Sequence, residues 1–127
     1  MVFSIQGSRP IWQQLTEQLA RRIITGAYPL GARFPAVREL AAEAGVNPNT
    51  MQRALQQLER EGLVFTQRSS GRFITEDTAA IGEAKRTLAR QHIEQFMASM
   101  KKLGYTREEI IALLEGGEEE DKNGSML

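Results

Sequence analysis

The sequence of 127 residues contains no cysteine, a single histidine and few aromatic residues, which make up 6% of the chain. The absence of cysteine excludes disulfides and cysteine-ligated zinc, and a histidine without neighbouring ligands predicts no metal site. No apolar run reaches the roughly 18 residues that a membrane helix requires. We therefore expect a cytoplasmic protein with no cofactor, no metal and no contact with a membrane.

Residue patterns for catalysis are also missing from the sequence. It has no carboxylate pair, no nucleophile placed with a histidine and no glycine-rich phosphate loop. Acid–base, covalent and phosphoryl-transfer chemistry depend on such patterns, and a chain of this length leaves little room for a separate catalytic domain. The sequence therefore predicts a protein that is not an enzyme and has no catalytic residues.

Lysine is absent from the first part of the chain, although the net charge of the whole chain is zero. Residues 1–76 carry nine arginines against six glutamates, a net charge of +3, and residues 77–127 carry seven basic and ten acidic residues, a net charge of −3. The planar guanidinium group matches phosphate and the edge of guanine better than an ammonium group does. This distribution indicates nucleic-acid binding by the first part; arginines that only solvate exposed helices are the alternative.

Three helices and a hairpin are predicted in the first part of the chain. Apolar residues recur every three or four positions, as in amphipathic helices, and a glycine follows each segment. The predicted helices span about 10–25, 36–44 and 48–61. Two β-prone runs, 63–67 and 72–75, flank a polar turn and predict a hairpin. The fold class is therefore mainly α with a small β-hairpin.

The order of these elements is that of a winged helix-turn-helix. Gly45 permits the tight turn before the third helix, Asn47 is suited to cap that helix, and Pro48 suits its first position. An α-helix fits the major groove of B-DNA when the preceding helix and turn hold it at the required angle. A hairpin tip with small and basic residues suits a wing on phosphate or the minor groove. The candidate DNA-binding residues are Arg9, Arg33, Arg38, Asn47, Asn49, Thr50, Gln52, Arg53, Gln56, Arg68, Ser69, Ser70, Gly71 and Arg72.

The second part of the chain predicts a dimerisation tail. A helix over 78–103 has a long apolar face, and a short helix over 107–115, which Thr106 and Glu109 cap, cannot cover it. A second copy of the chain is the simplest cover. The predicted domains are a DNA-binding domain, a helical dimerisation tail and a disordered acidic tail: 1–76, 77–117 and 118–127. The candidate dimerisation residues are Ile81, Leu88, Ile93, Phe96, Met97, Met100, Leu103, Ile110 and Leu114.

Four separated motifs follow one another over about residues 10–75: PIWQQL at 10–15, GARFPAVRELA at 31–41, GVNPNTMQRAL at 45–55 and LEREGL at 58–63. In order and spacing they resemble the GntR family of bacterial transcription regulators. The resemblance implies that Arg38 contacts a base or phosphate and that Asn47, Asn49 and Thr50 open the recognition helix. A basic residue is common in the family at the position of Gln52, so either Gln52 or the adjacent Arg53 contacts a base.

The short tail resembles that of the YtrA subfamily. This resemblance implies dimerisation through the tail, regulation that is often of transporter operons, and a tail too small for a roomy ligand cavity. Members of the family are most often repressors, and a two-fold dimer implies an inverted-repeat operator in double-stranded DNA. A small-molecule effector of unassigned chemistry remains an open alternative. So does a different function, in which the winged fold serves as a protein-interaction module without specific DNA binding.

Overall fold

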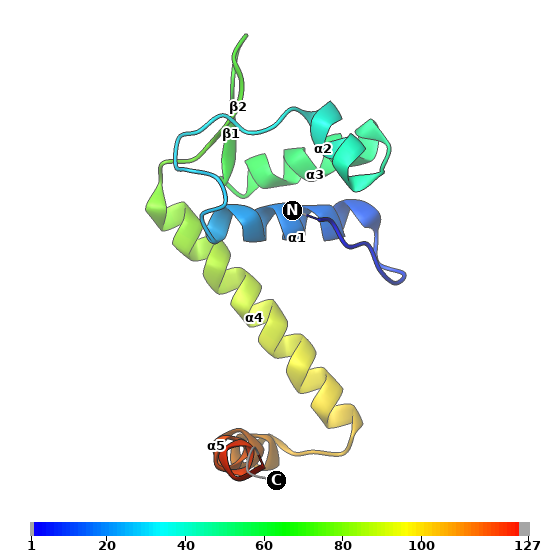
Figure 1. Ribbon diagram of the computed structural model, residues 1–127, viewed down its shortest axis with the longest axis vertical. Coiled ribbons are helices and arrows are strands. Elements are labelled where there is room, and N and C mark those ends of the chain that lie inside the picture. Colours follow the sequence, from blue (N-terminus) through cyan, green and yellow to red (C-terminus); the bar gives the residue numbers. More distant parts are fainter. Residues whose placement is uncertain (1, 125–127) are drawn as a thin grey trace. The chain divides into compact units, whose positions relative to one another are not determined.

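The computed structural model describes residues 2–124, with side chains described as far as Gly116, and it divides into two compact units, Met1–Leu88 and Ala89–Leu127. Within the described residues it has five helices and one two-stranded hairpin (Figure 1). The elements in chain order are α1 (Ile11–Ile24), α2 (Val37–Ala44), α3 (Pro48–Arg60), β1 (Val64–Gln67), β2 (Gly71–Ile74), α4 (Thr78–Lys102) and α5 (Arg107–Gly124). The mainly α fold with a small hairpin is confirmed.

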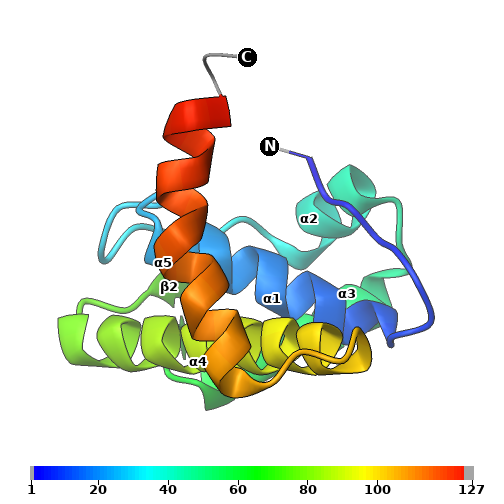
Figure 2. The ribbon, with the colours of Figure 1, turned by 90° about the horizontal axis from the view of Figure 1, so that it is seen from below.

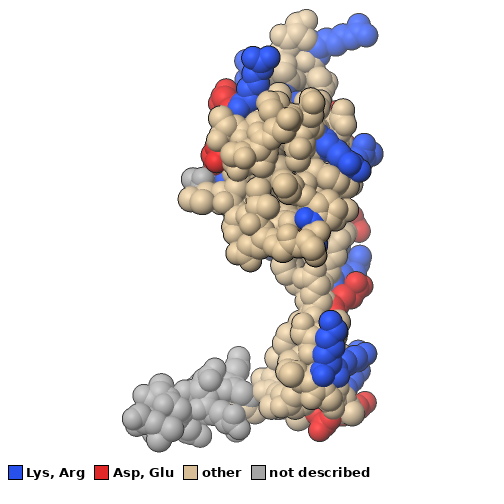
Figure 3. Space-filling view, turned by 90° about the vertical axis from the view of Figure 1, so that its right-hand side faces the viewer, with Lys and Arg blue, Asp and Glu red and all other residues tan. Residues whose placement is uncertain are grey.

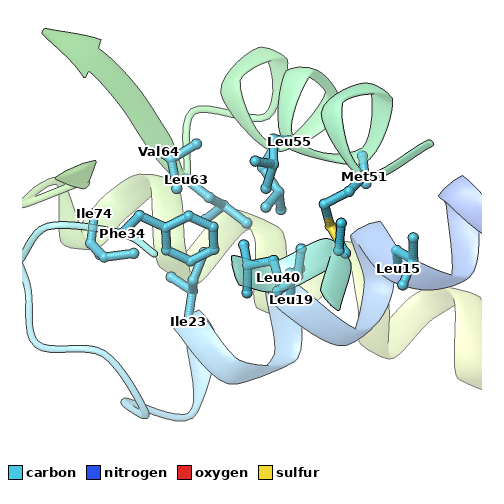
Figure 4. Close-up of a cluster of buried hydrophobic side chains, with 14 residues drawn as sticks. Leu15, Leu19, Ile23, Phe34, Leu40, Met51, Leu55, Leu63, Val64 and Ile74 are labelled. Carbon is cyan, nitrogen blue, oxygen red and sulfur yellow. The ribbon is translucent and has the colours of Figure 1, made fainter. Parts of the chain in front are cut away.

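The core of the first unit lies where three helices and the hairpin meet. Both α1 and α2 pack against α3 (Figure 2). Their apolar faces converge with the base of the hairpin on the ring of Phe34, which is 3% exposed (Figure 4). Phe34 also contacts Tyr28 edge to face, with ring centroids 5.1 Å apart. The side chains buried in this core are Leu15, Leu19, Ala20, Ile23, Phe34, Leu40, Ala41, Met51, Ala54, Leu55, Leu58, Leu63, Val64 and Ile74.

The hairpin is antiparallel and projects away from the helices (Figure 1). Its register pairs Val64 with Ile74 at the buried base. The segment before α2 adds a short third edge: Arg33 forms a β-bridge with Phe73, and the Phe34 N–H donates to the Arg72 carbonyl at 2.8 Å. The sequence predicts only a loop here, because a bridge this short produces no alternating pattern.

The first unit extends further than the boundary at residue 76 that the sequence predicts. Asp77 caps α4, with its Oδ1 accepting from the N–H groups of Ala79 at 2.9 Å and Ala80 at 3.3 Å. The first turns of α4 then pack against the core through Ile81, Ala84 and Leu88. The boundary therefore moves to Leu88, since these apolar residues cover the core of their own chain.

The second unit confirms the predicted cap and corrects the predicted end of the last helix. Thr106 and Glu109 form the expected capping box, each donating its N–H to the side chain of the other at 2.9 and 3.2 Å. The α5 helix then runs to Gly124, although the sequence predicts an end at Glu115 and disorder from residue 118. Residues 125–127 of the predicted disordered tail lie outside the described residues.

The described helices include none that is both long and apolar enough to span a bilayer.

Candidate nucleic-acid interface

The helix-turn-helix is formed by α2, a turn at Gly45 and α3. Gly45 adopts the left-handed conformation, with φ of 69°, which glycine tolerates without steric cost. Asn47 caps α3: its side-chain Oδ1 accepts the N–H of Asn49 at 2.7 Å, and Pro48 follows at the first helical position. The predicted turn and cap are confirmed. Asn47 therefore has a structural task in addition to the DNA contact predicted for it.

The outer face of α3 is polar, as predicted, because its apolar residues Met51, Ala54, Leu55 and Leu58 are all buried in the core. Asn49, Arg53 and Gln56 are exposed, whereas Thr50 and Gln52 are half-buried. The predicted base-contacting residues therefore lie on or beside one solvent-facing surface of a capped helix. Arg38 is exposed on the first turn of α2.

The two flanks of α3 face different neighbours. On one flank, Glu59 binds the hairpin, and Gln52 lies two helical turns earlier on the same side. On the other flank, the Arg53 guanidinium carbon lies 4.3 Å from the centre of the Trp12 ring of α1. Trp12 is half-buried, so one side of its ring is available for this contact. The sequence leaves the choice between Gln52 and Arg53 open, and the helical period relative to Glu59 puts Gln52 on the flank of the wing.

The tip of the wing is formed by Arg68, Ser69 and Ser70, which connect β1 to β2. Arg68 and Ser69 are exposed, and Ser69 has a φ of 67°, unusual for a residue other than glycine. Basic side chains reach the outer end of the first unit, where the hairpin lies (Figure 3). The predicted wing residues at the tip are therefore accessible to a phosphate backbone.

Arg33 comes from the segment before α2, yet its side chain lies along the wing. A Cβ atom added to Gly71 would be 3.3 Å from Arg33 Nη2 and 3.4 Å from its Nε. The φ of Gly71 is 100°, so glycine serves here both for backbone conformation and for the space that Arg33 occupies. Two predicted residues, distant in sequence, are thereby brought together beside the tip.

Two other predicted arginines form ion pairs within the chain. Arg72 Nε donates to Glu59 Oε1 at 2.5 Å, and the Thr66 hydroxyl donates to the same oxygen at 2.9 Å. Arg9 binds Glu17 through both of its terminal nitrogens, the Nη1 contact being 3.1 Å. The hydrogen bonds that Arg9 donates to the Glu17 carboxylate raise the pKa of Arg9 above its usual value. The positive charge of each of these arginines is thus already balanced by a carboxylate of the same chain.

The sequence does not single out Glu59 or Arg22, and both organise the unit. Arg22 is buried and donates to Glu43 Oε1 of α2 at 3.0 Å and to the Tyr28 hydroxyl at 3.2 Å. Its guanidinium also lies 4.1 Å from the centre of the Phe3 ring. The only sequence signal for Glu59 is that it is the first acid on the outer face of α3, two turns beyond Gln52.

The predicted dimerisation residues fall into three groups. Ile81 and Leu88 pack against the core of the first unit, so that core already accounts for their burial. In the second unit, Ile110 is buried and Met97 and Met100 are half-buried. The remaining four are exposed: Ile93, Phe96, Leu103 and Leu114.

A capped helix with a polar outer face, held by a preceding helix and turn and flanked by a basic-tipped hairpin, defines a winged helix-turn-helix DNA-binding protein. Residues 12–74 match the family model described as bacterial regulatory proteins, gntR family. The chain belongs to this GntR family, whose members are transcription regulators and not enzymes.

Individual relatives align with this protein over most of its length. The HTH-type transcriptional regulator YhcF of Bacillus subtilis (strain 168) is 41% identical over 106 residues, which cover 84% of this chain and 88% of that protein. The HTH-type transcriptional repressor YtrA of the same organism is 32% identical over 124 residues, covering 91% and 95%. The solved structure of a GntR family transcriptional regulator from Listeria monocytogenes has a TM-score of 0.76 at 38% identity, covering 87% of this chain and 97% of that chain. The resemblance to YtrA-type regulators is thereby confirmed.

Proposed function

We propose that this protein is a cytoplasmic, homodimeric repressor that binds an inverted-repeat operator through α3 and the wing. The observation that carries the proposal is the polar outer face of α3, free of acidic side chains from Asn49 to Gln56, beside a basic wing tip. The repressor role is supported by the similar chain length and sequence of YtrA, which is named a repressor. The resemblance of this protein to YtrA-type regulators also favours a transporter operon as the target.

The homodimer is proposed from apolar side chains that the second unit leaves exposed. Leu103 is 73% exposed, and Ile93 and Leu114 are each 60% exposed. Burying a leucine or isoleucine side chain gains roughly 1.5–3 kcal/mol, so several such residues on one small unit favour association. A two-fold dimer buries the same surface of both copies and presents two α3 helices to two half-sites.

Base contact is assigned to Gln52 in preference to Arg53. Gln52 lies on the same flank as the wing, whereas the guanidinium of Arg53 is over Trp12 on the flank of α1. A glutamine amide can bond adenine at two positions in the major groove. Asn49 and Gln56, on the exposed outer face, are the other candidates for base contact.

Selection of binding sites from random duplex DNA tests this function. With the full chain at about 0.15 M salt, where non-specific binding is weakened, we expect an enriched inverted repeat whose half-sites lie about one helical turn or a multiple apart. Enrichment of no sequence would favour the protein-interaction alternative. An enriched single half-site bound by a monomer would overturn the dimer. A reporter gene carrying the selected site at its promoter then distinguishes repression from activation.

A further inference from the structure

One carboxylate oxygen joins both strands of the wing to the recognition helix. Glu59 Oε1, on the last turn of α3, accepts from Arg72 Nε of β2 at 2.5 Å and from the Thr66 hydroxyl of β1 at 2.9 Å. Thr66 and Arg72 are direct partners in the hairpin register. The covalent connection through Gly62 fixes only the base of the hairpin, and this contact holds it two residues further out.

The Glu59–Arg72 pair is sheltered from solvent. The side chains retain 32% and 19% of their exposure, respectively. An ion pair that is partly removed from water is screened less by salt than an exposed pair. Removing one partner leaves the other charge uncompensated in a partly dehydrated position. We therefore expect the ion pair between Arg72 and Glu59 to persist when a phosphate backbone approaches.

The tip of the wing offers phosphate a different set of arginines. Arg68 is exposed at the tip, and Arg33, also an exposed residue, has its guanidinium beside Gly71. Each phosphate neutralised by a lysine or arginine contributes about −0.9 to the slope of log K against log salt. The slope of log K against log salt therefore reports how many arginines of the wing bind phosphate.

We propose that Glu59 is a positioning residue for DNA binding: it fixes the wing against α3 and withholds Arg72 from phosphate, so that Arg68 and Arg33 supply the contacts of the wing. The proposal rests on the proposed function, because the wing must meet the DNA that α3 binds. An acid placed beside a DNA-binding surface weakens indiscriminate binding and sets the angle at which specific binding occurs.

The test measures affinity by fluorescence anisotropy over a series of salt concentrations, with the selected operator and with a random duplex. Glu59→Gln frees Arg72 in each wing, so we expect the salt slope to steepen on both duplexes by about 0.9 for each wing that contacts DNA, about 1.8 for a dimer. We also expect the ratio of specific to non-specific affinity to fall about tenfold, comparable to the loss at one mismatched base pair. The double variant Glu59→Gln with Arg72→Gln removes the pair without changing the net charge, so its slope should equal that of the wild type.

Arg68→Gln is the matched control, and its slope should become shallower by about 0.9 for each wing that contacts DNA. A double variant whose slope also becomes shallower by that amount would show that Arg72 binds phosphate and would overturn the proposal. Glu59→Gln with an unchanged slope and an unchanged specificity ratio would overturn it as well. If Glu59→Gln fails to fold by circular dichroism, the slope of the double variant decides. The random duplex separates the two proposals, because its slopes report on the wing even if no specific operator is found.

Discussion

The guanidinium carbon of Arg53 lies 4.3 Å from the centre of the Trp12 ring and thereby joins the recognition helix to α1. A cation–π contact at such an accessible site contributes about 0.5–1 kcal/mol, enough to set the preferred direction of the side chain. The opposite flank of α3 binds the wing through Glu59. The recognition helix thus has one flank that braces the domain and another that is directed towards the wing.

This division predicts different effects for two neighbouring substitutions. Gln52→Ala should lower the affinity for the selected operator by about 1–3 kcal/mol, the energy of a good base contact, and leave binding to random DNA nearly unchanged. Arg53→Ala should weaken both complexes to a similar extent, because it removes a positive charge without removing a base contact. Competition binding at one fixed salt concentration measures both. A loss confined to the operator for Arg53→Ala would reverse the assignment.

The environments of Arg22 and Arg21 predict a large and a small effect on stability, respectively, for these adjacent arginines. Arg22 is buried and bonded to Glu43 and the Tyr28 hydroxyl, whereas Arg21 is exposed on the same helix. Arg22→Ala should lower the free energy of unfolding by about 1.5–3 kcal/mol, the usual contribution of hydrogen bonds to a charged group. Arg21→Ala should change it by less than about 0.5 kcal/mol. Urea denaturation followed by circular dichroism measures the difference, and equal losses would contradict the bracing role of Arg22.

Local chemistry explains why so much of the fold is predictable from the sequence. The turn at Gly45, the cap at Asn47 and the capping box of Thr106 and Glu109 depend on residues within four positions of one another. Such contacts form wherever the backbone permits, so the sequence predicts them directly. The order of the elements then defines the winged helix-turn-helix. Because the apolar face of α3 is buried in the core, its polar face is the one that remains towards solvent.

Which of several similar side chains forms a given ion pair depends on contacts between residues far apart in the sequence. Nine arginines precede residue 77, and the sequence cannot show that Arg72 binds Glu59 while Arg68, four residues earlier, is exposed at the tip. The same holds for the apolar face of α4. Its periodicity predicts that this face is buried, but not which surface covers it. The structure places Leu88 against the core of the first unit, so only the later residues of the tail remain for the proposed dimer.

Substitution of Gly71 should lower the affinity for DNA, and this loss can be separated from the effect of backbone strain. Gly71→Ala introduces a Cβ atom 3.3 Å from Arg33 Nη2 in a residue whose φ is 100°. Gly104 has a similar φ of 95° but nothing within 4 Å of its Cβ position. Both substitutions should lower stability by a similar amount, about 1 kcal/mol. Only Gly71→Ala should also weaken binding to random duplex DNA, and an equal affinity for both variants would contradict the role of Arg33.

Substitutions of Leu88 in α4 and of Leu103, just beyond the end of α4, should separate folding from association. Leu103 is 73% exposed, and Leu88 packs against the core. Leu103→Asp should shift sedimentation from dimer to monomer while leaving the circular dichroism spectrum unchanged. Leu88→Asp should lower the unfolding midpoint instead, because it buries a charge without a partner. A dimer that survives Leu103→Asp would place the association surface elsewhere on the chain.

Glu59 predicts an acid dependence of stability with a defined sign. Burial opposes ionisation, but hydrogen bonds from Arg72 and Thr66 outweigh it and hold the pKa of Glu59 below its ordinary value of 4.5. A carboxyl group whose pKa is lower in the folded state stabilises the fold above its ordinary pKa, and this contribution is lost as the pH falls through the folded pKa. The difference in unfolding free energy between the wild type and Glu59→Gln should therefore be constant near neutral pH and shrink below pH 4.5.

Urea denaturation at a series of pH values measures this difference. Glu61→Gln provides the control, because Glu61 is exposed just beyond the same helix end and an exposed substitution away from the wing should give only a small difference in stability. A difference for Glu59→Gln that persists unchanged at acid pH would show that the variant acts through packing and that the ionised carboxylate does not hold the wing. A difference that shrinks in parallel with the loss of DNA specificity would connect the same ion pair to both stability and binding.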